Sequence, residues 1–318
     1  MQEVTGWKCV DPALRGASVA LGNFDGVHLG HQSVINLARR PGAPLGVVTF
    51  EPHPREFFAP QAPPFRLMNA EARSNRLARL GVERLFTLPF GPDLAGLSAE
   101  AFAAEVLRDG LGVSHVVVGE DFCFGKGRAG TAAMLADMGR QMGFDVTIAP
   151  LLGGASGAVS STAIRAALTD GRPADAARML GHWHRIDGAV MHGEKRGREL
   201  GYPTANMSIE GLHPPRFGVY AVKLDVLNGP HQGAYAGVAS LGVRPMFGEN
   251  RPNLETFIFD FTGDLYGASL SVALVAFLRG EVKFESLETL IAQMDRDSTE
   301  ARAALAKAPD WPRVGASR

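Results

Sequence analysis

The spacing of apolar residues changes near Gly181, and this change limits the chain to two domains of different build. Before Gly181, short apolar runs alternate with amphipathic helical stretches. Strands separated by helices predict a parallel sheet wound by right-handed crossovers. We therefore expect a wound α/β domain over residues 1–181, with strands at Ser18–Leu21, Leu45–Phe50, Arg84–Leu88, His115–Val118 and Val146–Ala149.

Helix signals in this half come from caps and breakers as well as from apolar spacing. Ser98 can cap a helix that runs to Arg108 and ends at Gly110. The other expected helices have apolar side chains three or four residues apart. They lie at His31–Arg40, Thr162–Leu168 and Ala174–Leu180.

Beyond Gly181 the apolar runs are strand-like and are separated by Gly, Pro and Asn. Short strands at this spacing favour a small antiparallel barrel, expected over residues 182–318. The runs are Ile186–Met191, Val219–Val226, Ala234–Ala239, Leu254–Phe261 and Leu270–Phe277. A closing helix is expected over Ser286–Lys307, with the apolar stripe Leu287, Leu290, Ile291 and Met294.

The bulk composition excludes several classes of protein. A net charge of −1 provides no field that would gather nucleic acid or an anionic membrane. Cys9 and Cys123 lack the number and spacing of a disulfide framework or a metal site, which favours reduced thiols. No apolar run has signal-peptide character or approaches the roughly 20 residues that cross a bilayer. We expect a cytoplasmic protein whose partners are small molecules.

A glycine-rich segment joins the first strand to the first helix. It runs from Gly22 to Gly26 and continues to His28 and His31. The glycines let the backbone pass close to a ligand, and the helix N-terminus offers free N–H groups to an anion. A single histidine here would usually be a cap or a packed ring. Two histidines three residues apart can donate hydrogen bonds to the same phosphate and stabilise the charge that builds on a departing pyrophosphate.

Three further segments are expected to serve the same chemistry. Val48–Pro54 and Gly119–Gly125 each end a strand, at the carboxyl edge where open α/β sheets bind ligands. Val159–Arg165 opens a helix with Arg165 in its first turn, where a cation opposes the helix dipole unless an anion shares the site. Taken alone, Arg165 would be a solvated residue behind serine caps. With the histidine pair it becomes a second phosphate-binding element.

Together these segments resemble the FAD synthetase module of bacterial bifunctional riboflavin kinase/FAD synthetases, members of the HxGH nucleotidyltransferase superfamily. The resemblance implies a Rossmann-like nucleotidyltransferase domain in which the FMN phosphate itself attacks ATP. It implies catalytic roles for His28 and His31. The nucleotide-binding residues that it implies are Gly22, Asn23, Phe24, Asp25, Gly26, Asp121, Ser161, Thr162 and Arg165.

The segment Gly188–Met207 places glycines and basic residues ahead of Pro203-Thr204-Ala205-Asn206. It does not match a Walker A loop, which excludes an ordinary P-loop kinase. The Thr204 hydroxyl and the Asn206 carbonyl are neutral hard oxygens, suited to a Mg²⁺ that takes its other ligands from water and nucleotide phosphates. Taken alone, the two residues are more typical of a turn.

Glu255 lies in an aromatic strand run. Because side chains alternate along a strand, it is expected to share a face with Phe257, Phe259 and Phe261. A carboxylate beside an apolar face is poorly hydrated, which raises its pKa and suits it to take a proton from a hydroxyl near neutral pH. The alternative is a glutamate at a strand end that reaches solvent.

The second half resembles the riboflavin kinase signature, in which the PTAN residues bind metal and ATP and the glutamate at the position of Glu255 is catalytic. Met246 departs from the threonine that many members carry, which puts a polar contact there in doubt. The closing helix resembles the flavin-side segment of the family and implies flavin contacts for Asp297 and Arg302. A surface pair of charges is the alternative for these two.

The resemblance extends from about Ala17 to Arg302 and implies two activities. The C-terminal domain would phosphorylate riboflavin to FMN with ATP and Mg²⁺, and the N-terminal domain would adenylylate FMN to FAD with release of pyrophosphate. One alternative is a nucleotidyltransferase for nicotinamide mononucleotide or phosphopantetheine, which has no use for the PTAN segment. Another is a flavin-binding regulatory protein, for which the metal ligands and the base would be dispensable.

Overall fold

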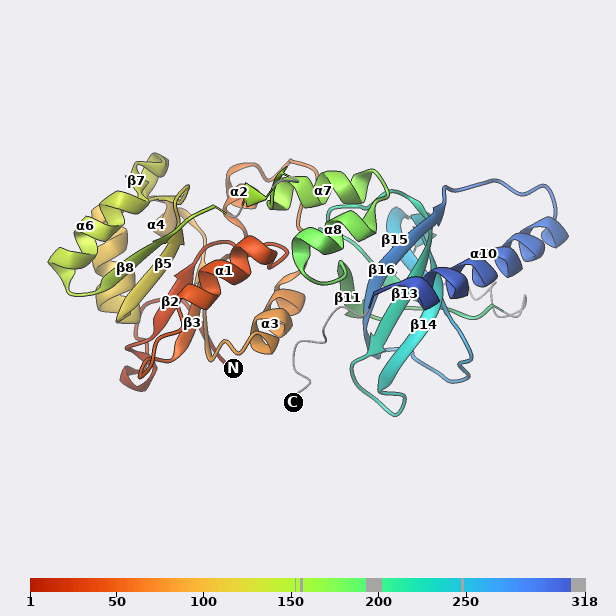
Figure 1. Cartoon of the computed structure of the whole chain (residues 1–318), viewed down its shortest axis with the longest axis horizontal. Coiled ribbons are helices and arrows are strands. Elements are labelled where there is room, and N and C mark those ends of the chain that lie inside the picture. Colours follow the sequence, from red (N-terminus) through yellow and green to blue (C-terminus); the bar gives the residue numbers. More distant parts are fainter. Residues whose placement is uncertain (152, 155–156, 193–201, 247–248, 310–318) are drawn as a thin grey trace. The chain divides into compact units, whose positions relative to one another are not determined.

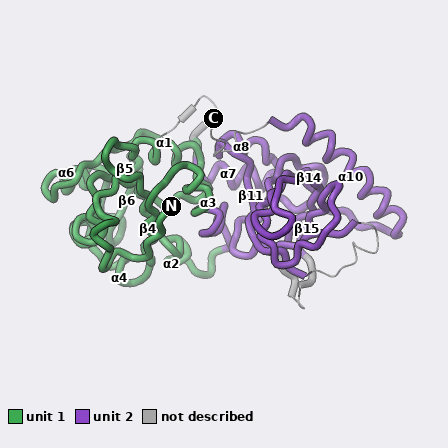
Figure 2. Tube along the Cα trace, turned by 90° about the horizontal axis from the view of Figure 1, so that it is seen from below, with its two compact units in different colours: residues 1–62, 73–159, 314–318 green, residues 63–72, 160–313 purple. Residues whose placement is uncertain are grey.

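The computed structural model describes residues 1–151, 153–154, 157–192, 202–246 and 249–309 (Figure 1). Its contacts divide the chain into two compact units, drawn in green and purple in Figure 2. The first comprises Met1–Ala62 and Arg73–Val159, and the second comprises Pro63–Ala72 and Ser160–Arg313. The division by contacts therefore falls ahead of the change in apolar spacing at Gly181.

A six-stranded sheet forms the centre of the first unit. Its order is β1-β4-β3-β2-β5-β8, and every neighbouring pair is parallel. The wound α/β fold and the five predicted strands are confirmed. The sequence does not predict β1, because this edge strand is largely exposed and has no apolar alternation. The strands are β1 (Gln2–Thr5), β2 (Ser18–Leu21), β3 (Leu45–Glu51), β4 (Arg84–Pro89), β5 (His115–Gly119) and β8 (Asp145–Ala149).

Side-chain caps begin several helices of this part. His28 caps α1, which ends at Leu37, so the helix is shorter at its C-terminus than the predicted His31–Arg40. Ser98 caps as predicted, and the helix then continues as a π-helix past Gly110 to the left-handed Gly112. The elements are α1 (Leu29–Leu37), α2 (Pro54–Phe58), α3 (Ala70–Arg79), α4 (Pro92–Ala95), α5 (Ala99–Ala101), the π-helix η2 (Phe102–Leu111), α6 (Ala132–Met142), the 3₁₀ turns η1 (Pro12–Leu14) and η3 (Lys126–Arg128), and the two-residue strands β6 (Cys123–Phe124), β7 (Gly130–Thr131), β9 (Gly153–Gly154) and β10 (Gly157–Ala158).

The second unit contains a nearly closed antiparallel barrel, which confirms the predicted change of fold class. Its strand order is β11-β16-β13-β14-β15-β12, and a backbone bridge between Met191 and Asn206 links the two edges. Alternate residues of the strands fill the barrel with apolar side chains. The elements are α7 (Ser161–Thr169), α8 (Pro173–Leu180), β11 (Arg185–Ala189), β12 (Thr204–Ser208), β13 (Gly218–Val226), β14 (Gly233–Met246), β15 (Glu249–Ile258), β16 (Ser269–Arg279) and α10 (Leu287–Lys307).

Several features of this unit differ from the sequence expectations. β14 continues to Met246, beyond the expected end at Ala239, and β15 runs from Glu249 to Ile258 in place of the expected Leu254–Phe261. β12 is a strand where no strand was expected, because its mixed sequence carries only two inward apolar side chains, Ala205 and Met207. On α10 the expected stripe is wrong at Leu287, which is 51% exposed. The helix instead packs through its second half, where Ala301 joins a cluster of barrel side chains.

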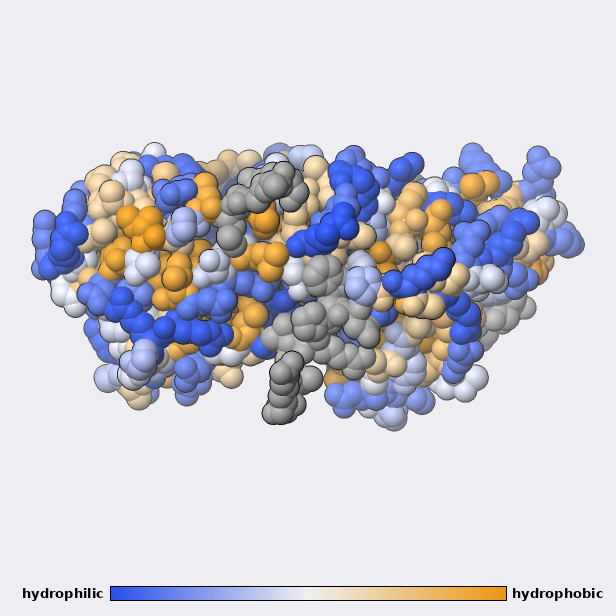
Figure 3. Space-filling model, in the orientation of Figure 1, coloured by the Kyte–Doolittle hydropathy of each residue, from blue (hydrophilic) through white to orange (hydrophobic). Residues whose placement is uncertain are grey.

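No helix in the described ranges is long and apolar enough to cross a membrane. On the face drawn in Figure 3, hydrophobic and hydrophilic residues are intermixed over each unit. That face therefore carries no continuous apolar surface.

Candidate active sites

The loop that follows β2 is held in an unusual backbone conformation. Phe24, Gly26 and Val27 all have positive φ, at 53°, 86° and 43°. For a residue with a side chain, this region costs roughly 1–2 kcal/mol, so the neighbouring structure must enforce it. Thr49 Oγ1 donates to the Asn23 carbonyl at 3.2 Å, and Gln32 Nε2 donates to the Val27 carbonyl at 2.9 Å. The loop is thus fixed on both sides, by β3 and by α1.

His28 and His31 lie together at the N-terminus of α1, as the sequence predicts. Their rings stack with centroids 3.6 Å apart and an interplanar angle of 15°. His28 is the N-cap residue, and its Nδ1 accepts from the His31 backbone N–H at 3.2 Å. Because Nδ1 is an acceptor, the neutral His28 ring carries its proton on Nε2. Phe24, which is buried, packs edge-on against the His31 ring at 5.2 Å.

Burial keeps the second histidine uncharged. Desolvation, followed by the nearby His28, holds the pKa of His31 well below its usual 6.5. Its Nδ1 is buried and has no hydrogen-bond partner among the described residues. An unpartnered ring nitrogen in a stacked pair costs stability and therefore calls for a ligand or another explanation.

Gly30, the glycine between the two histidines, is required by close packing. A Cβ built on Gly30 would lie 3.0 Å from Cε1 and 3.1 Å from Nδ1 of His28. A side chain there would require the His28 ring to shift by a few tenths of an ångström. The spacing of the His-x-Gly-His motif is therefore explained by ring stacking on the first helical turn.

Asp121 lies at the same edge of the sheet as the loop. It follows β5, which is the parallel neighbour of β2, and the loop Gly22–Gly26 follows β2. The Asp121 side chain is exposed. Polar residues after two adjacent parallel strands form the place where open α/β sheets bind ligands, which agrees with the sequence expectation for this edge.

The predicted residues at α7 belong to the second unit. Ser160 is the cap, and its Oγ accepts from the Ala163 N–H at 3.2 Å, so that Ser161 and Thr162 form the first turn. The Arg165 Nε donates to the Phe65 carbonyl at 2.6 Å, and its guanidinium lies 5.3 Å from the Phe65 ring centre.

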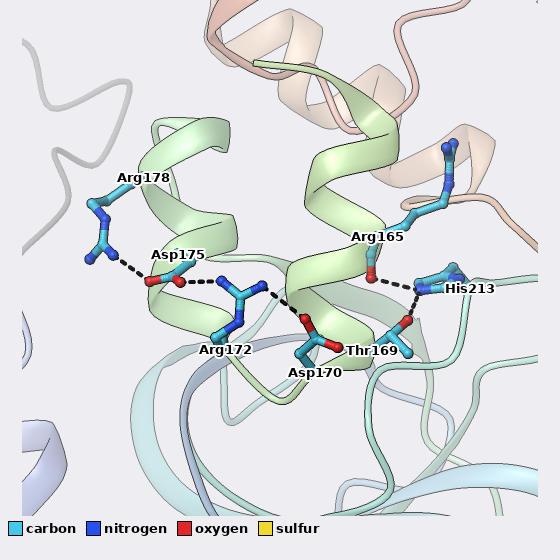
Figure 4. Close-up of polar contacts among 7 residues, drawn as sticks. All are labelled: Arg165, Thr169, Asp170, Arg172, Asp175, Arg178 and His213. Atoms are coloured by element: carbon cyan, nitrogen blue, oxygen red, sulfur yellow. Dashed lines mark hydrogen bonds and ion pairs between the residues drawn. The ribbon is translucent and has the colours of Figure 1, made fainter. Parts of the chain in front are cut away.

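Figure 4 shows the Arg165 side chain extending away from His213, whose ring contacts the Arg165 carbonyl at 3.1 Å and the Thr169 hydroxyl at 3.0 Å. Across the α7–α8 turn, Arg172 pairs with Asp170 at 2.9 Å and also with Asp175. The contacts of His213 and Arg172 hold α7 at its C-terminal end. The Arg165 guanidinium lies on the side of α7 away from His213.

Glu255 lies on one face of the barrel with the PTAN residues. In the pairing of β12 with β15, Asn206 is opposite Glu255 and Thr204 is opposite Phe257. Residues directly opposite in antiparallel strands project from the same face. Glu255 is half-buried there, and Ser240 of β14 flanks it on the other side. The sequence predicted Thr204, Asn206 and Glu255, but it did not predict that Asn206 and Glu255 are cross-strand neighbours, and it did not predict Ser240.

The aromatic surroundings of Glu255 are partly as expected. Phe257 and Phe259 share a cluster with Ala301 of α10, on the outer face of the barrel. Phe261 does not share it, because Asp260 has a φ of 56°, which breaks the strand alternation, and Phe261 packs against the barrel interior instead. The prediction for Phe261 was therefore wrong.

A short chain of amides surrounds Asn206. Its Nδ2 donates to the carbonyl of Thr204 at 3.3 Å and to Thr204 Oγ1 at 3.4 Å. Its Oδ1 accepts from Asn253 Nδ2 at 3.3 Å. Sequence analysis missed Asn253, although it stands two residues before Glu255 and strand alternation would have placed the two on one face.

Charged partners within the protein engage both residues that the sequence assigned to the flavin. Asp297 is buried, and its carboxylate accepts from Arg279 at 2.6 Å and from Gln293 at 2.8 Å. Arg302 makes two 2.9 Å bonds to Asp260 and lies 4.1 Å from the Phe259 ring centre.

A second residue that sequence analysis missed joins this helix to the PTAN segment. Tyr202 donates its hydroxyl to Asp295 of α10 and packs on Phe257 with ring centres 4.7 Å apart. Desolvation and the bond to Asp295 raise the pKa of Tyr202 to about 12, so the phenol stays a donor.

Across the described ranges, no group of three or more His, Cys, Asp or Glu side chains is placed to hold a metal ion. A cation at the barrel face would therefore depend on neutral oxygens such as those of Thr204 and Asn206. The basic residues Lys195, Arg196 and Arg198 lie outside the described residues.

Two family models match the chain, FAD synthetase at residues 10–163 and riboflavin kinase at residues 180–305. Curated relatives of the whole chain carry the name bifunctional riboflavin kinase/FMN adenylyltransferase. The relative from Pseudomonas fluorescens is 42% identical over 308 residues, 95% of this chain and 97% of that protein. Those from Escherichia coli strain K12 and Bacillus subtilis strain 168 are each 38% identical, over 90% and 89% of this chain and 92% and 90% of their own.

A solved structure has the same arrangement of elements over nearly the whole chain. It is a crystal structure described as a macrolide-efflux protein from Streptococcus pneumoniae, with a TM-score of 0.81 and 32% identity. The match covers 94% of this chain and 98% of the other. Both compact units therefore have a counterpart in one solved chain.

Proposed function

The chain belongs to the family of bifunctional riboflavin kinase/FMN adenylyltransferases, and we propose that its two reactions use the two residue sets described above. The C-terminal part phosphorylates riboflavin to FMN with ATP. The N-terminal part adenylylates FMN to FAD, also with ATP. We assign the first reaction to residues 182–318 and the second to residues 1–181, a division supported by the family matches, which end at residue 163 and resume at 180.

In the kinase reaction, Glu255 accepts the proton of the riboflavin 5′-hydroxyl as that oxygen attacks the γ-phosphorus of ATP. The bond from the γ-phosphorus to the bridging oxygen breaks, and ADP leaves. The observation that carries this assignment is the register that puts Glu255 directly opposite Asn206. Phosphoryl transfer depends mainly on positioning and charge neutralisation, so a base fixed beside the nucleotide ligands meets its needs.

The oxygens at the barrel face fit Mg²⁺. Thr204 offers its hydroxyl and its carbonyl, and Asn206 offers an amide whose nitrogen is now 3.3–3.4 Å from both. Neutral oxygens in small number suit a cation that keeps water and phosphate ligands. When bound to Thr204 and Asn206, Mg²⁺ would neutralise charge on the ATP phosphates.

In the adenylyl transfer, the FMN phosphate oxygen attacks the α-phosphorus of ATP, and pyrophosphate leaves. His28 Nε2 and the His31 ring donate to the polyphosphate from the N-terminus of α1. Because burial keeps His31 neutral, the ring places an N–H donor near the phosphates without requiring a charged side chain in a desolvated site. Asp121 and the loop Gly22–Gly26 bind the nucleotide at the same edge.

We assign Ser161, Thr162 and Arg165 to phosphate binding in the N-terminal reaction. Ser161 and Thr162 lie in the capped first turn of α7, whereas Arg165 is the fifth residue of the helix and lies in its second turn, not in the first turn that the sequence predicts. We assign Arg302 and Asp297 to the flavin side of the kinase. To contact a ligand, Arg302 would have to bind it in addition to Asp260, and Asp297 in addition to Arg279. We place the enzyme in the cytoplasm, since both reactions consume ATP and Cys9 and Cys123 are free thiols.

The function is tested by incubating the purified chain with riboflavin, ATP and Mg²⁺ and separating the flavins by chromatography. FMN should form first and FAD should follow. With FMN supplied instead of riboflavin, FAD should form directly and pyrophosphate should appear in equal amount. Absence of FMN in the first incubation would contradict the kinase assignment, and absence of FAD in the second would contradict the transferase assignment.

A further inference from the structure

The amide of Asn253 has an unusual environment. The residue is 2% exposed, and its Nδ2 donates to Asn206 Oδ1 at 3.3 Å. Its Oδ1 is buried and has no hydrogen-bond partner among the described residues. A buried acceptor left without a donor typically costs about 1–3 kcal/mol. One end of the amide is therefore left unsatisfied in the present orientation.

The amide of Asn206 is turned unfavourably for metal binding, because its nitrogen and not its oxygen faces Thr204. Asn206 now points its Nδ2 at the Thr204 carbonyl and Oγ1, so a donor stands where a cation would need an oxygen. Its Oδ1 points at Asn253. The Asn206 orientation is fixed on one side by Asn253, because two NH₂ groups cannot face each other favourably.

A half-turn of both amides changes the site. The oxygen and nitrogen of an asparagine amide occupy nearly equivalent positions, so such a turn requires little space. Asn206 Nδ2 would then donate to Asn253 Oδ1, and Asn206 Oδ1 would face the carbonyl and Oγ1 of Thr204. Three oxygens would then be gathered in place of two oxygens and a donor, which is the set that a hard divalent cation prefers.

We propose that Asn253 is a positioning residue of the kinase reaction: its amide sets which end of the Asn206 amide faces Thr204, and so whether a divalent cation meets three oxygens. The proposal rests on the assignment of Thr204 and Asn206 as metal ligands. Residues that orient metal ligands typically change metal affinity 10- to 100-fold when they are replaced.

The chain offers a matched control in Thr256. It is the third residue after Asn253 on the same strand, it is 0% exposed, and its Oγ1 is also buried without a partner among the described residues. It projects to the barrel interior, however, opposite Ala205 and Ala239. Thr256→Val therefore perturbs the same strand and removes a similar buried, unpartnered oxygen, and it leaves the contacts of Asn206 unchanged.

The test uses the full chain and Mn²⁺, a paramagnetic substitute whose free concentration is measured by electron paramagnetic resonance. Titrations are made with ADP present in wild type, Asn206→Ala, Asn253→Leu, Asn253→Asp and Thr256→Val. The barrel site is defined as the class of Mn²⁺-binding sites that is present in wild type and absent in Asn206→Ala. We expect Asn253→Leu to weaken that class about 10-fold or more. We expect Asn253→Asp, which can only accept, to hold Asn206 in the oxygen-inward orientation and keep at least wild-type affinity, and Thr256→Val to change nothing.

The outcomes separate the possibilities. Wild-type Mn²⁺ affinity in Asn253→Leu, with the class lost in Asn206→Ala, overturns the inference and leaves the ligand assignment intact. Retention of the class in Asn206→Ala removes the ligand assignment, and the inference falls with it. If Asn253→Leu does not fold, judged by the loss of the barrel's thermal unfolding transition, Asn253→Asp decides: equal loss of affinity there would show a merely structural asparagine.

Discussion

The Asn206 amide on β12 and the Glu255 carboxylate on β15 are direct cross-strand partners, so they project from one face of the barrel sheet. Thr204 lies on the same face, opposite Phe257. The proposed base and the proposed metal ligands thus occupy adjacent positions on two hydrogen-bonded strands. Rigid strands hold such groups more precisely than loops do, which suits a reaction that depends on positioning.

Glu255→Gln should remove most FMN formation and spare FAD formation from supplied FMN. The amide keeps the size of the side chain but cannot accept the hydroxyl proton, and general-base catalysis typically contributes about 10²–10⁴-fold. The measurement is the initial rate of each reaction by chromatography. Glu300→Gln, at an exposed position of α10, is the matched control. Near-normal kinase turnover in Glu255→Gln would show that another group is the base.

Replacing both histidines of the motif should have the reverse effect. His28→Ser keeps an N-cap for α1, which an alanine would remove at a cost of about 1 kcal/mol, so His28→Ser with His31→Ala is the better double variant. Loss of one transition-state donor typically costs about 10²–10³ in rate, so FAD formation should nearly vanish. Riboflavin should still be converted, and FMN should accumulate. A folded double variant that makes FAD at the wild-type rate would contradict the assignment.

Gly30→Ala should lower FAD formation by displacing the His28 ring, which the new Cβ would meet at 3.0–3.1 Å. A small misplacement at a reactive centre can cost up to about 10²-fold, and we expect at least a 10-fold loss with little change in melting temperature. Gly91→Ala is the control, since a Cβ on Gly91 meets nothing within 4 Å. Equal activity of Gly30→Ala and Gly91→Ala would mean that the stacked rings are not needed.

The stability of the first unit should decrease as the pH falls below 6.5. The Ser18 hydroxyl donates its proton to the Ala38 carbonyl, and its oxygen therefore accepts from His115 Nδ1. The other ring nitrogen, His115 Nε2, accepts from the Thr147 hydroxyl. Burial, followed by the charge of Arg40, lowers the pKa of His115 to about 4.

Between pH 6.5 and about 4 the unfolded chain therefore binds a proton that folded His115 does not. The free energy of unfolding should fall in that window, by at most about 1.4 kcal/mol per pH unit for this group, and should be unaffected above it. Urea unfolding of wild type and His115→Asn at several pH values measures it, and the variant should show a shallower pH dependence. Parallel curves for the two proteins would contradict the prediction.

A fragment that begins at His182 should still make FMN, but with lower stability than one that begins at Ser160. Ala177 of α8 shares a buried cluster with Trp183, Ala273 and Val275, and the shorter fragment would expose these side chains. A loss of about 2 kcal/mol corresponds to roughly 5–10 °C in melting temperature for a domain of this size. Calorimetry and a kinase assay on both fragments check this. Equal melting temperatures would show that the α7–α8 pair does not stabilise the barrel.

Sequence alone was sufficient for most of the fold because its signals are local. The strands of the first sheet are continuous apolar runs, and their boundaries agree with the structure to within one residue. Elements without an apolar pattern were missed: β1 is an exposed edge, and β12 has apolar side chains only at its inward positions. On α10, burial depends on which half of the helix meets the barrel, and the pattern of the helix does not contain that information.

The same distinction holds for the sites. Sequence by itself determined the identities of His28, His31, Thr204, Asn206 and Glu255, since motifs specify residue types at short spacing. Tertiary structure decided which of them meet, because cross-strand register joins Asn206 to Glu255 across 49 positions of the chain. It also decided what surrounds them. Asn253 and its unpartnered oxygen become visible only when the two strands are paired and their side chains are buried in the folded chain.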